Sequence, residues 1–170
     1  MSIRSRLFAL PMPGFLRAAC IQRLARLTSA AFGLDPRRIR RLDRYAAFTA
    51  EQAEAAMNAG TGTRDIEGRL FGRARELGSR LRFWLGVRKD DEAMAVARAL
   101  YRVIGVDFEA GDSGRFAVSR CFFSSCYSAS ACRLISSLDA GLLCGLSGRR
   151  EMVFTRRMTE GARLCEGVIR

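Results

Sequence analysis

The chain has 170 residues, a length typical of one folded domain, and 49% of them are hydrophobic, which is enough for a substantial core. Its formal net charge is +12, and arginine supplies all but one of its 29 basic residues. It contains no histidine, which excludes Ser-His-Asp and Cys-His catalysis and imidazole-dependent zinc sites, so a general base must be Asp, Glu, Cys, Tyr or a bound water.

The first 32 residues are basic and contain the first predicted helix. Two arginines and an apolar stretch within residues 4–10 resemble the start of a signal peptide, but Pro11, Pro13 and Arg17 interrupt it. We therefore expect no export signal, a cytoplasmic location and reduced cysteines. Apolar residues recur on one side of 15–32 with arginines opposite, which predicts a helix.

The arginine excess leaves three interpretations open. It can reflect genome composition and simple solvation of the surface, which is the interpretation we favour. An arginine-rich, acid-poor N-terminal helix can also touch an anionic membrane or act as an organelle address. Nucleic acid is the third candidate, but the chain lacks aromatic-rich RNA-binding strands, so we do not expect it as a partner. No uncharged apolar run approaches 18 residues, so no membrane-spanning helix is expected.

Helical periodicity continues to residue 104. The predicted helices cover 37–47, a segment from Thr49 to Met57, Asp65 to about Leu85, and a segment from Asp90 or Asp91 to Ile104. Thr49 followed by Gln52 is a capping-box signature, which places a helix boundary at Thr49. The glycines within 58–62 predict a linker.

The pattern changes after Gly105. Apolar and polar residues alternate around a turn at 110–114, which predicts two strands; a helix capped by Ser128 and two further strands follow. The fold class is therefore α+β, with a helical N-terminal region packed on a small antiparallel sheet with a helix (β-β-α-β-β). We divide the chain into a mainly helical region, 1–104, and a cysteine-rich α+β region, 105–170, which together form one compact domain.

Five of the six cysteines lie in the C-terminal region. No CxxC pair occurs, so zinc-ribbon and thioredoxin signatures are absent. Each cysteine is by itself more typical of a small core residue than of a reactive one. We predict that Cys121 and Cys165 end strands and that Cys132 lies early in a helix. Neighbouring arginines could lower the pKa of these thiols if they are close in space.

Two acids and two arginines complete the candidate site. Asp139 lies in an apolar stretch, so it is either a paired or proton-transferring buried carboxyl or a group that faces solvent. Glu160 is the second acid that we place inside. Arg156 and Arg157 either bind a substrate carboxylate or face water. No phosphate-binding glycine motif is present, and the spacing leaves the cofactor, the metal state and the oligomeric state unknown.

These residues carry a family resemblance. The segment from Val118 to Ser124, the stretch from Ile135 to Leu142, and the closing Arg157, Gly161 and Cys165 resemble the L-2-amino-thiazoline-4-carboxylic acid hydrolase-like family of bacterial proteins. The N-terminal helices are compatible with that family over nearly the full length. A similar glycine-to-cysteine ending occurs in small-molecule-binding domains of the vinyl-reductase type.

The resemblance implies a hydrolase that opens a cyclic amidine ring and yields a carbamoyl-cysteine. It implies proton transfer by Asp139 or Glu160, a nucleophile or ligand role for Cys121 or Cys132, and substrate binding by Arg156, Arg157 and Cys165. The alternative is a non-catalytic sensor that binds a small molecule or a metal with the vinyl-reductase-like architecture. Both hypotheses predict a small-molecule partner.

Overall fold

The computed structural model describes residues 13–60, 62–111 and 113–170. The described helices are α2 (Gly14–Ala31), α3 (Leu42–Asn58), α4 (Thr63–Leu85), α5 (Asp90–Val103) and α6 (Ala129–Ser147), with short 3-10 helices η1 (Phe122–Ser125) and η2 (Met158–Glu160). The strands are β1 (Val106–Ala110), β2 (Arg115–Cys121), β3 (Met152–Arg156) and β4 (Cys165–Ile169), and they form one antiparallel sheet in the order β1-β2-β4-β3. The predicted α+β class and the β-β-α-β-β ending are confirmed.

Most predicted elements are present, with one clear error in the helical region. The helix boundary at Thr49 is wrong, because α3 runs through it and the Thr49 hydroxyl donates to the backbone oxygen of Tyr45 at 2.9 Å. Ser128 caps α6 as expected, since its hydroxyl accepts from the backbone nitrogen of Ala131 at 3.1 Å. The signal-peptide question at 1–12 lies outside the described residues, as do Thr61 of the predicted linker and Asp112 of the predicted turn.

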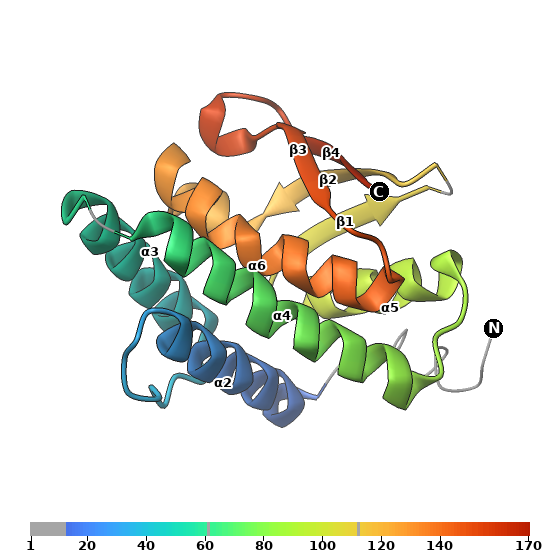
Figure 1. The fold of residues 1–170 in the computed structure, drawn as a ribbon, viewed down its shortest axis with the longest axis horizontal. Coiled ribbons are helices and arrows are strands. Elements are labelled where there is room, and N and C mark those ends of the chain that lie inside the picture. Colours follow the sequence, from blue (N-terminus) through green and yellow to red (C-terminus); the bar gives the residue numbers. More distant parts are fainter. Residues whose placement is uncertain (1–12, 61, 112) are drawn as a thin grey trace.

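Helix α6 is the central element of the fold. Figure 1 shows the sheet on one side of α6, with α4 running alongside it and α2 and α3 on the side away from the sheet. A single hydrophobic core includes residues of the helical region, such as Leu70 and Val96, together with Phe116 and Leu143 from beyond residue 105. The boundary drawn at residue 104 stays a prediction.

The composition of α6 follows from this position. Within the described ranges, α6 is the one helix long and apolar enough to cross a membrane, but 61% of it is buried inside the fold. Its two sides contact different partners, so an apolar surface almost all round is what a core helix needs. We assign it to the core of the protein.

Three glycines set the distance between α4 and α6. A Cβ atom at Gly141 would lie 2.2 Å from the backbone oxygen of Phe71, and one at Gly145 would lie 2.2 Å from that of Arg75. A Cβ atom at Gly78 would lie 2.3 Å from the backbone oxygen of Leu142. The two helices therefore touch through their backbones, with glycine on both sides of the contact.

We predict that Gly145→Ala destabilises the protein by about 3 kcal/mol, because the added methyl group meets rigid backbone rather than a side chain that can turn away. The matched control is Gly72→Ala in α4, whose Cβ would meet nothing within 4 Å. Alanine should stabilise that exposed helical site by about 1 kcal/mol. Urea unfolding of the two variants measures both effects, and equal changes at the two sites would contradict the backbone contact.

Candidate functional site

A cavity of about 450 Å³ occupies the centre of the molecule. Every described helix and strand contributes to its lining, from Cys20 in α2 to Cys165 in β4. The lining is mostly apolar, and its volume lies within the range of small-molecule sites. The exposed residues of its lining, Arg23, Arg80 and Trp84, are on α2 and α4, so we take the mouth of the cavity to lie between these helices.

A row of four rings lies along the sheet side of the cavity. We call Tyr101, Phe108, Phe116 and Phe154 the aromatic row. Ring centroids are 5.0 Å apart between Tyr101 and Phe108, 5.8 Å between Phe108 and Phe116, and 5.1 Å between Phe116 and Phe154. Gly167 pairs with both Phe116 and Phe154 in the sheet, and a Cβ there would lie 2.4 Å from the Phe116 ring. Glycine at this position therefore lets the two rings meet.

Asp139 brings a carboxyl group into this apolar space. It lies on the α6 face that lines the cavity and is only partly buried, so its carboxyl group is reached from the cavity. The Tyr101 hydroxyl donates to its Oδ1 atom at 2.9 Å. Burial raises the pKa of Asp139 to about 6, against the lowering effects of the Tyr101 hydrogen bond and the positive charge of Arg157.

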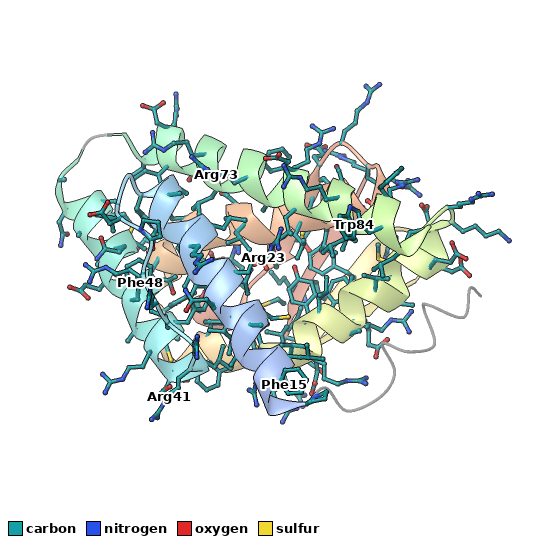
Figure 2. All side chains as sticks on the ribbon, turned by 90° about the horizontal axis from the view of Figure 1, so that it is seen from below. Phe15, Arg23, Arg41, Phe48, Arg73 and Trp84 are labelled. Carbon is teal, nitrogen blue, oxygen red and sulfur yellow. The ribbon has the colours of Figure 1, made fainter. Side chains whose placement is uncertain are left out.

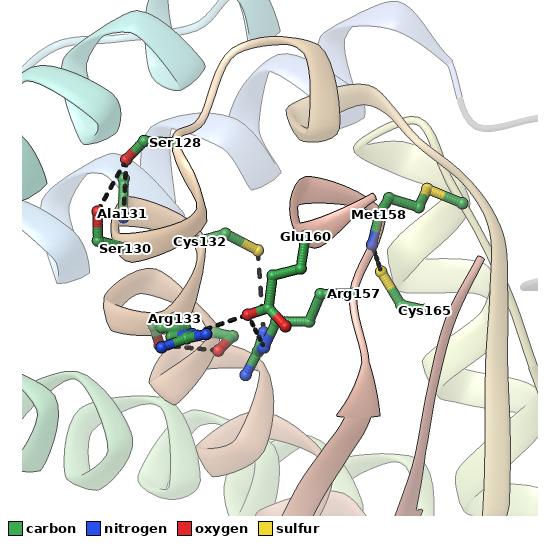
Figure 3. Close-up of polar contacts among 10 residues, drawn as sticks. Ser128, Ser130, Ala131, Cys132, Arg133, Arg157, Met158, Glu160 and Cys165 are labelled. Atoms are coloured by element: carbon green, nitrogen blue, oxygen red, sulfur yellow. Dashed lines mark hydrogen bonds and ion pairs between the residues drawn. The ribbon is translucent and has the colours of Figure 1, made fainter. Parts of the chain in front are cut away.

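Arg157 stands at the other end of the aromatic row. Its guanidinium carbon lies 4.0 Å from the centre of the Phe154 ring, a cation–π geometry, and its side chain is only 14% exposed. Its Nη1 atom donates weakly to the Cys132 sulfur at 3.8 Å, and its Nε atom lies 3.8 Å from Glu160 Oε1 (Figure 3). The same oxygen of Glu160 accepts from Arg133 at 2.7 Å. Glu160 therefore positions Arg157 from outside the cavity.

Three thiols also belong to the cavity lining. Cys121, Cys132 and Cys165 all line it, and all six cysteines of the chain are free. Burial raises the pKa of Cys121 to about 12 and also raises that of Cys165. The backbone nitrogen of Met158 donates to the Cys165 sulfur at 3.4 Å. Because a thiol must ionise to attack, Cys121 and Cys165 are poorly suited as nucleophiles.

The structure thus brings together five of the seven predicted site residues. Asp139, Arg157 and the three thiols line one cavity, but Arg156 and Glu160 are not part of its lining. Arg156 is 72% exposed and pairs with Glu166 at 3.5 Å on the outside of the sheet. Cys121 ends β2 as predicted, whereas Cys165 begins β4 rather than ending a strand.

Sequence reasoning missed three tyrosines of the site. Tyr45, Tyr101 and Tyr127 all line the cavity, but none of them is among the predicted site residues. The Tyr45 hydroxyl shares a 3.0 Å hydrogen bond with that of Thr28, and the Tyr127 hydroxyl bonds that of Thr49. Desolvation raises the pKa of all three tyrosines, so they stay protonated. A phenol within an apolar helical stripe is the one signal that could have identified Tyr45 and Tyr101, whereas Tyr127 lies in the loop before α6.

The donor set does not suit a metal. Among the residues that the structure describes, no group of three or more Cys, Asp or Glu side chains could hold a metal ion. Instead, Arg157 lies between the carboxylate of Glu160 and the thiol of Cys132. The metal-binding form of the sensor hypothesis therefore has no support in the described part of the chain.

Comparisons with protein-family models, curated proteins and solved structures find no match to this chain. The resemblance to the thiazoline-carboxylate hydrolase-like family therefore stays a prediction. The site has to be interpreted from its own geometry.

We predict that Asp139→Asn flattens the pH dependence of stability between about pH 4 and 6. The pKa of Asp139 rises from its ordinary 3.8 to about 6 on folding, so the folded state binds more protons in this window. Rising pH through the window should therefore destabilise the native protein, by on the order of 2 kcal/mol from this group.

Urea unfolding at several pH values measures this contribution as the difference in the free energy of unfolding between the native protein and Asp139→Asn. The other carboxylates contribute equally to both proteins and cancel in the difference. A difference that stays constant from pH 4 to 6 would show that Asp139 is not buried as described. Asp107→Asn serves as a matched control, since Asp107 is an exposed partner of Arg120.

Proposed function

We propose that the protein binds a small, mostly apolar organic molecule in its central cavity and anchors the molecule's polar group at Asp139. The observation that carries the proposal is a buried carboxyl group, fixed by Tyr101, at the wall of a mostly apolar cavity of about 450 Å³. Ligand sites of proteins combine apolar walls with a few fixed polar groups in this way. This is the small-molecule form of the sensor hypothesis.

The aromatic row favours a ligand that contains a ring. Phe108 and Phe154 line the cavity directly, while Phe116 between them fixes their orientation. Aromatic pairs in offset or edge-to-face contact contribute about 0.5–1.5 kcal/mol beyond the burial of area. A flat ring lying over this row would gain such contacts, and an open-chain polar molecule would not.

The polar anchor favours a ligand that donates a hydrogen bond. With a pKa of about 6, Asp139 is ionised in about nine molecules out of ten at pH 7. Tyr101 occupies its Oδ1 atom, and Oδ2 accepts no hydrogen bond from any residue within the described ranges. An N–H or O–H group of a ligand would satisfy Oδ2, which otherwise remains a costly charge in an apolar space.

The second candidate is the ring-opening hydrolase implied by the family resemblance. One observation favours it, because a carboxyl group with a pKa near neutrality suits general acid–base catalysis. In this hypothesis Asp139 takes a proton from the water that attacks the amidine carbon and returns it to the departing ring atom, while Arg157 binds the substrate carboxylate. The free thiols of all six cysteines are in keeping with a cytoplasmic location under either candidate.

We predict that the uncharged fluorescent probe N-phenyl-1-naphthylamine binds the native protein and that Leu100→Trp weakens this binding at least tenfold. Leu100 lines the cavity and is partly buried, so the larger side chain of tryptophan at this position occupies space that a ligand needs without displacing the fully buried core. Fluorescence titration measures both affinities. Leu34→Trp is the matched control, because Leu34 does not line the cavity. Equal binding by the native protein and Leu100→Trp would contradict the proposal.

For the hydrolase candidate we predict that any turnover of 2-amino-thiazoline-4-carboxylate falls by about 10²- to 10⁴-fold in Asp139→Asn, the range expected for loss of a proton-transfer group. Cys121→Ser should retain activity, since the high pKa of Cys121 keeps it a thiol. Mass spectrometry of the carbamoyl-cysteine product measures the rate. Absence of product with the native protein would remove this candidate and leave the binding function intact.

A further inference from the structure

Exposed apolar side chains gather at two helix ends. Phe15 and Leu16 at the start of α2 are 72% and 43% exposed, and Phe83 and Trp84 at the end of α4 are 83% and 73% exposed. Only two other large hydrophobic side chains of the described residues, Phe122 and Val153, are exposed, and both are less so. Large exposed apolar groups that cluster in this way mark a surface that contacts something other than water.

Both helix ends lie beside the mouth of the cavity. Seen from the side of α2, the helices α2, α4 and α5 form a triangle, with Phe15 near one corner and Trp84 near another (Figure 2). Trp84 and Leu81 of α4, together with Cys20 and Leu24 of α2, belong to the cavity lining. We call this side of the molecule the mouth face.

The α2 side of the mouth face is also basic. Helix α2 contains Arg17, Arg23 and Arg26 and no acidic residue. Arg23 and Arg80 both line the cavity at its mouth. Arg80 pairs with Glu76 at 2.5 Å, whereas Arg23 has no ion pair with any described residue. Exposed aromatic rings beside arginines are the composition of a protein surface that lies in a membrane interface.

We propose that the mouth face docks on an anionic lipid bilayer, so that the cavity opens toward the membrane. The charge complementarity comes from α2 and from the net charge of +12, and the apolar contact comes from Phe15, Leu16, Phe83 and Trp84. A partner protein or a nucleic acid would match the charge, but neither accounts for an apolar cavity that opens between the exposed rings. The route of the ligand from bilayer to cavity rests on the proposed binding function, whereas the docking does not.

Trp84 is the only tryptophan of the chain, so it reports docking directly. With vesicles containing 30% phosphatidylglycerol in phosphatidylcholine, the emission of the full-length protein should shift to the blue, and brominated lipids should quench it. Vesicles of phosphatidylcholine alone should bind at least tenfold more weakly, and salt should weaken binding to the anionic vesicles. Equal binding to both vesicle types, or no binding to either, would overturn the proposal.

Two serine variants distinguish docking through the mouth face from nonspecific binding to the vesicles. Phe83→Ser should weaken vesicle binding about tenfold, because Phe83 is exposed and does not line the cavity. The matched control Val153→Ser, on β3 and outside the cavity lining, should leave vesicle binding unchanged. Equal weakening by both variants, or tighter binding to duplex DNA than to the anionic vesicles, would contradict the proposal.

The same variants distinguish failure of docking from failure of the proposed function. Phe83→Ser should bind N-phenyl-1-naphthylamine in vesicle-free buffer as the native protein does. Vesicle binding by Leu100→Trp, measured by co-sedimentation because this variant has a second tryptophan, should equal that of the native protein, since the filled cavity leaves the mouth face unchanged. A native protein that docks on the vesicles but binds no probe would refute the cavity function alone, and a native protein that binds the probe but does not dock would refute the docking alone.

Discussion

The backbone contact between α4 and α6 holds the site together. Gly141 and Gly145 on one helix and Gly78 on the other let the two backbones approach within a distance that no side chain would allow. This contact uses one side of α6 and fixes the rotation of the helix about its axis. The nearly opposite side, at Cys132, Ile135 and Asp139, is thereby directed into the cavity. A helix that was free to rotate would bury Asp139 against apolar residues with no hydrogen-bond partner, which is costly.

The charged groups of the site form one chain along the aromatic row. Tyr101 at one end donates to Asp139, and Arg157 at the other end stacks on Phe154 and reduces the cost of the buried carboxylate. Glu160 and Arg133 then hold the position of Arg157 from outside. A polar ligand group bound in this space changes the electrostatic environment of Asp139. The affinity for the ligand and the protonation of Asp139 should therefore be coupled. This coupling suits a binding protein as well as a proton-transfer enzyme.

Much of the fold could be predicted from the sequence, because helical and strand periodicities are strong in this chain. The break expected at Thr49 failed because its hydroxyl bonds within the helix and to Tyr127, a contact 78 residues away that local patterns do not contain. The roles of Gly141 and Gly145 could not be predicted either, since they depend on which helix packs against α6.

Five members of the candidate site could be predicted from the sequence, but the orientation of the side chains could not. Adjacent residues on a strand point to opposite sides, and a register shift between Phe154 and Arg156 decides which arginine faces inward. Arg157 turns toward the cavity and Arg156 toward solvent. The sequence alone is compatible with Asp139 facing either the interior or solvent. The hydrogen bond from Tyr101 shows that its side chain points to the interior.

The proposed function depends on a desolvated carboxyl group, that of Asp139, at the wall of an apolar cavity. The most direct test is a pH titration of its Cγ resonance by carbon-13 NMR, with the signal assigned by its loss in Asp139→Asn. We expect a midpoint near 6 in the native protein. A midpoint at or below the ordinary 3.8 would place the carboxyl group in water and rule out the proposed anchor for the ligand.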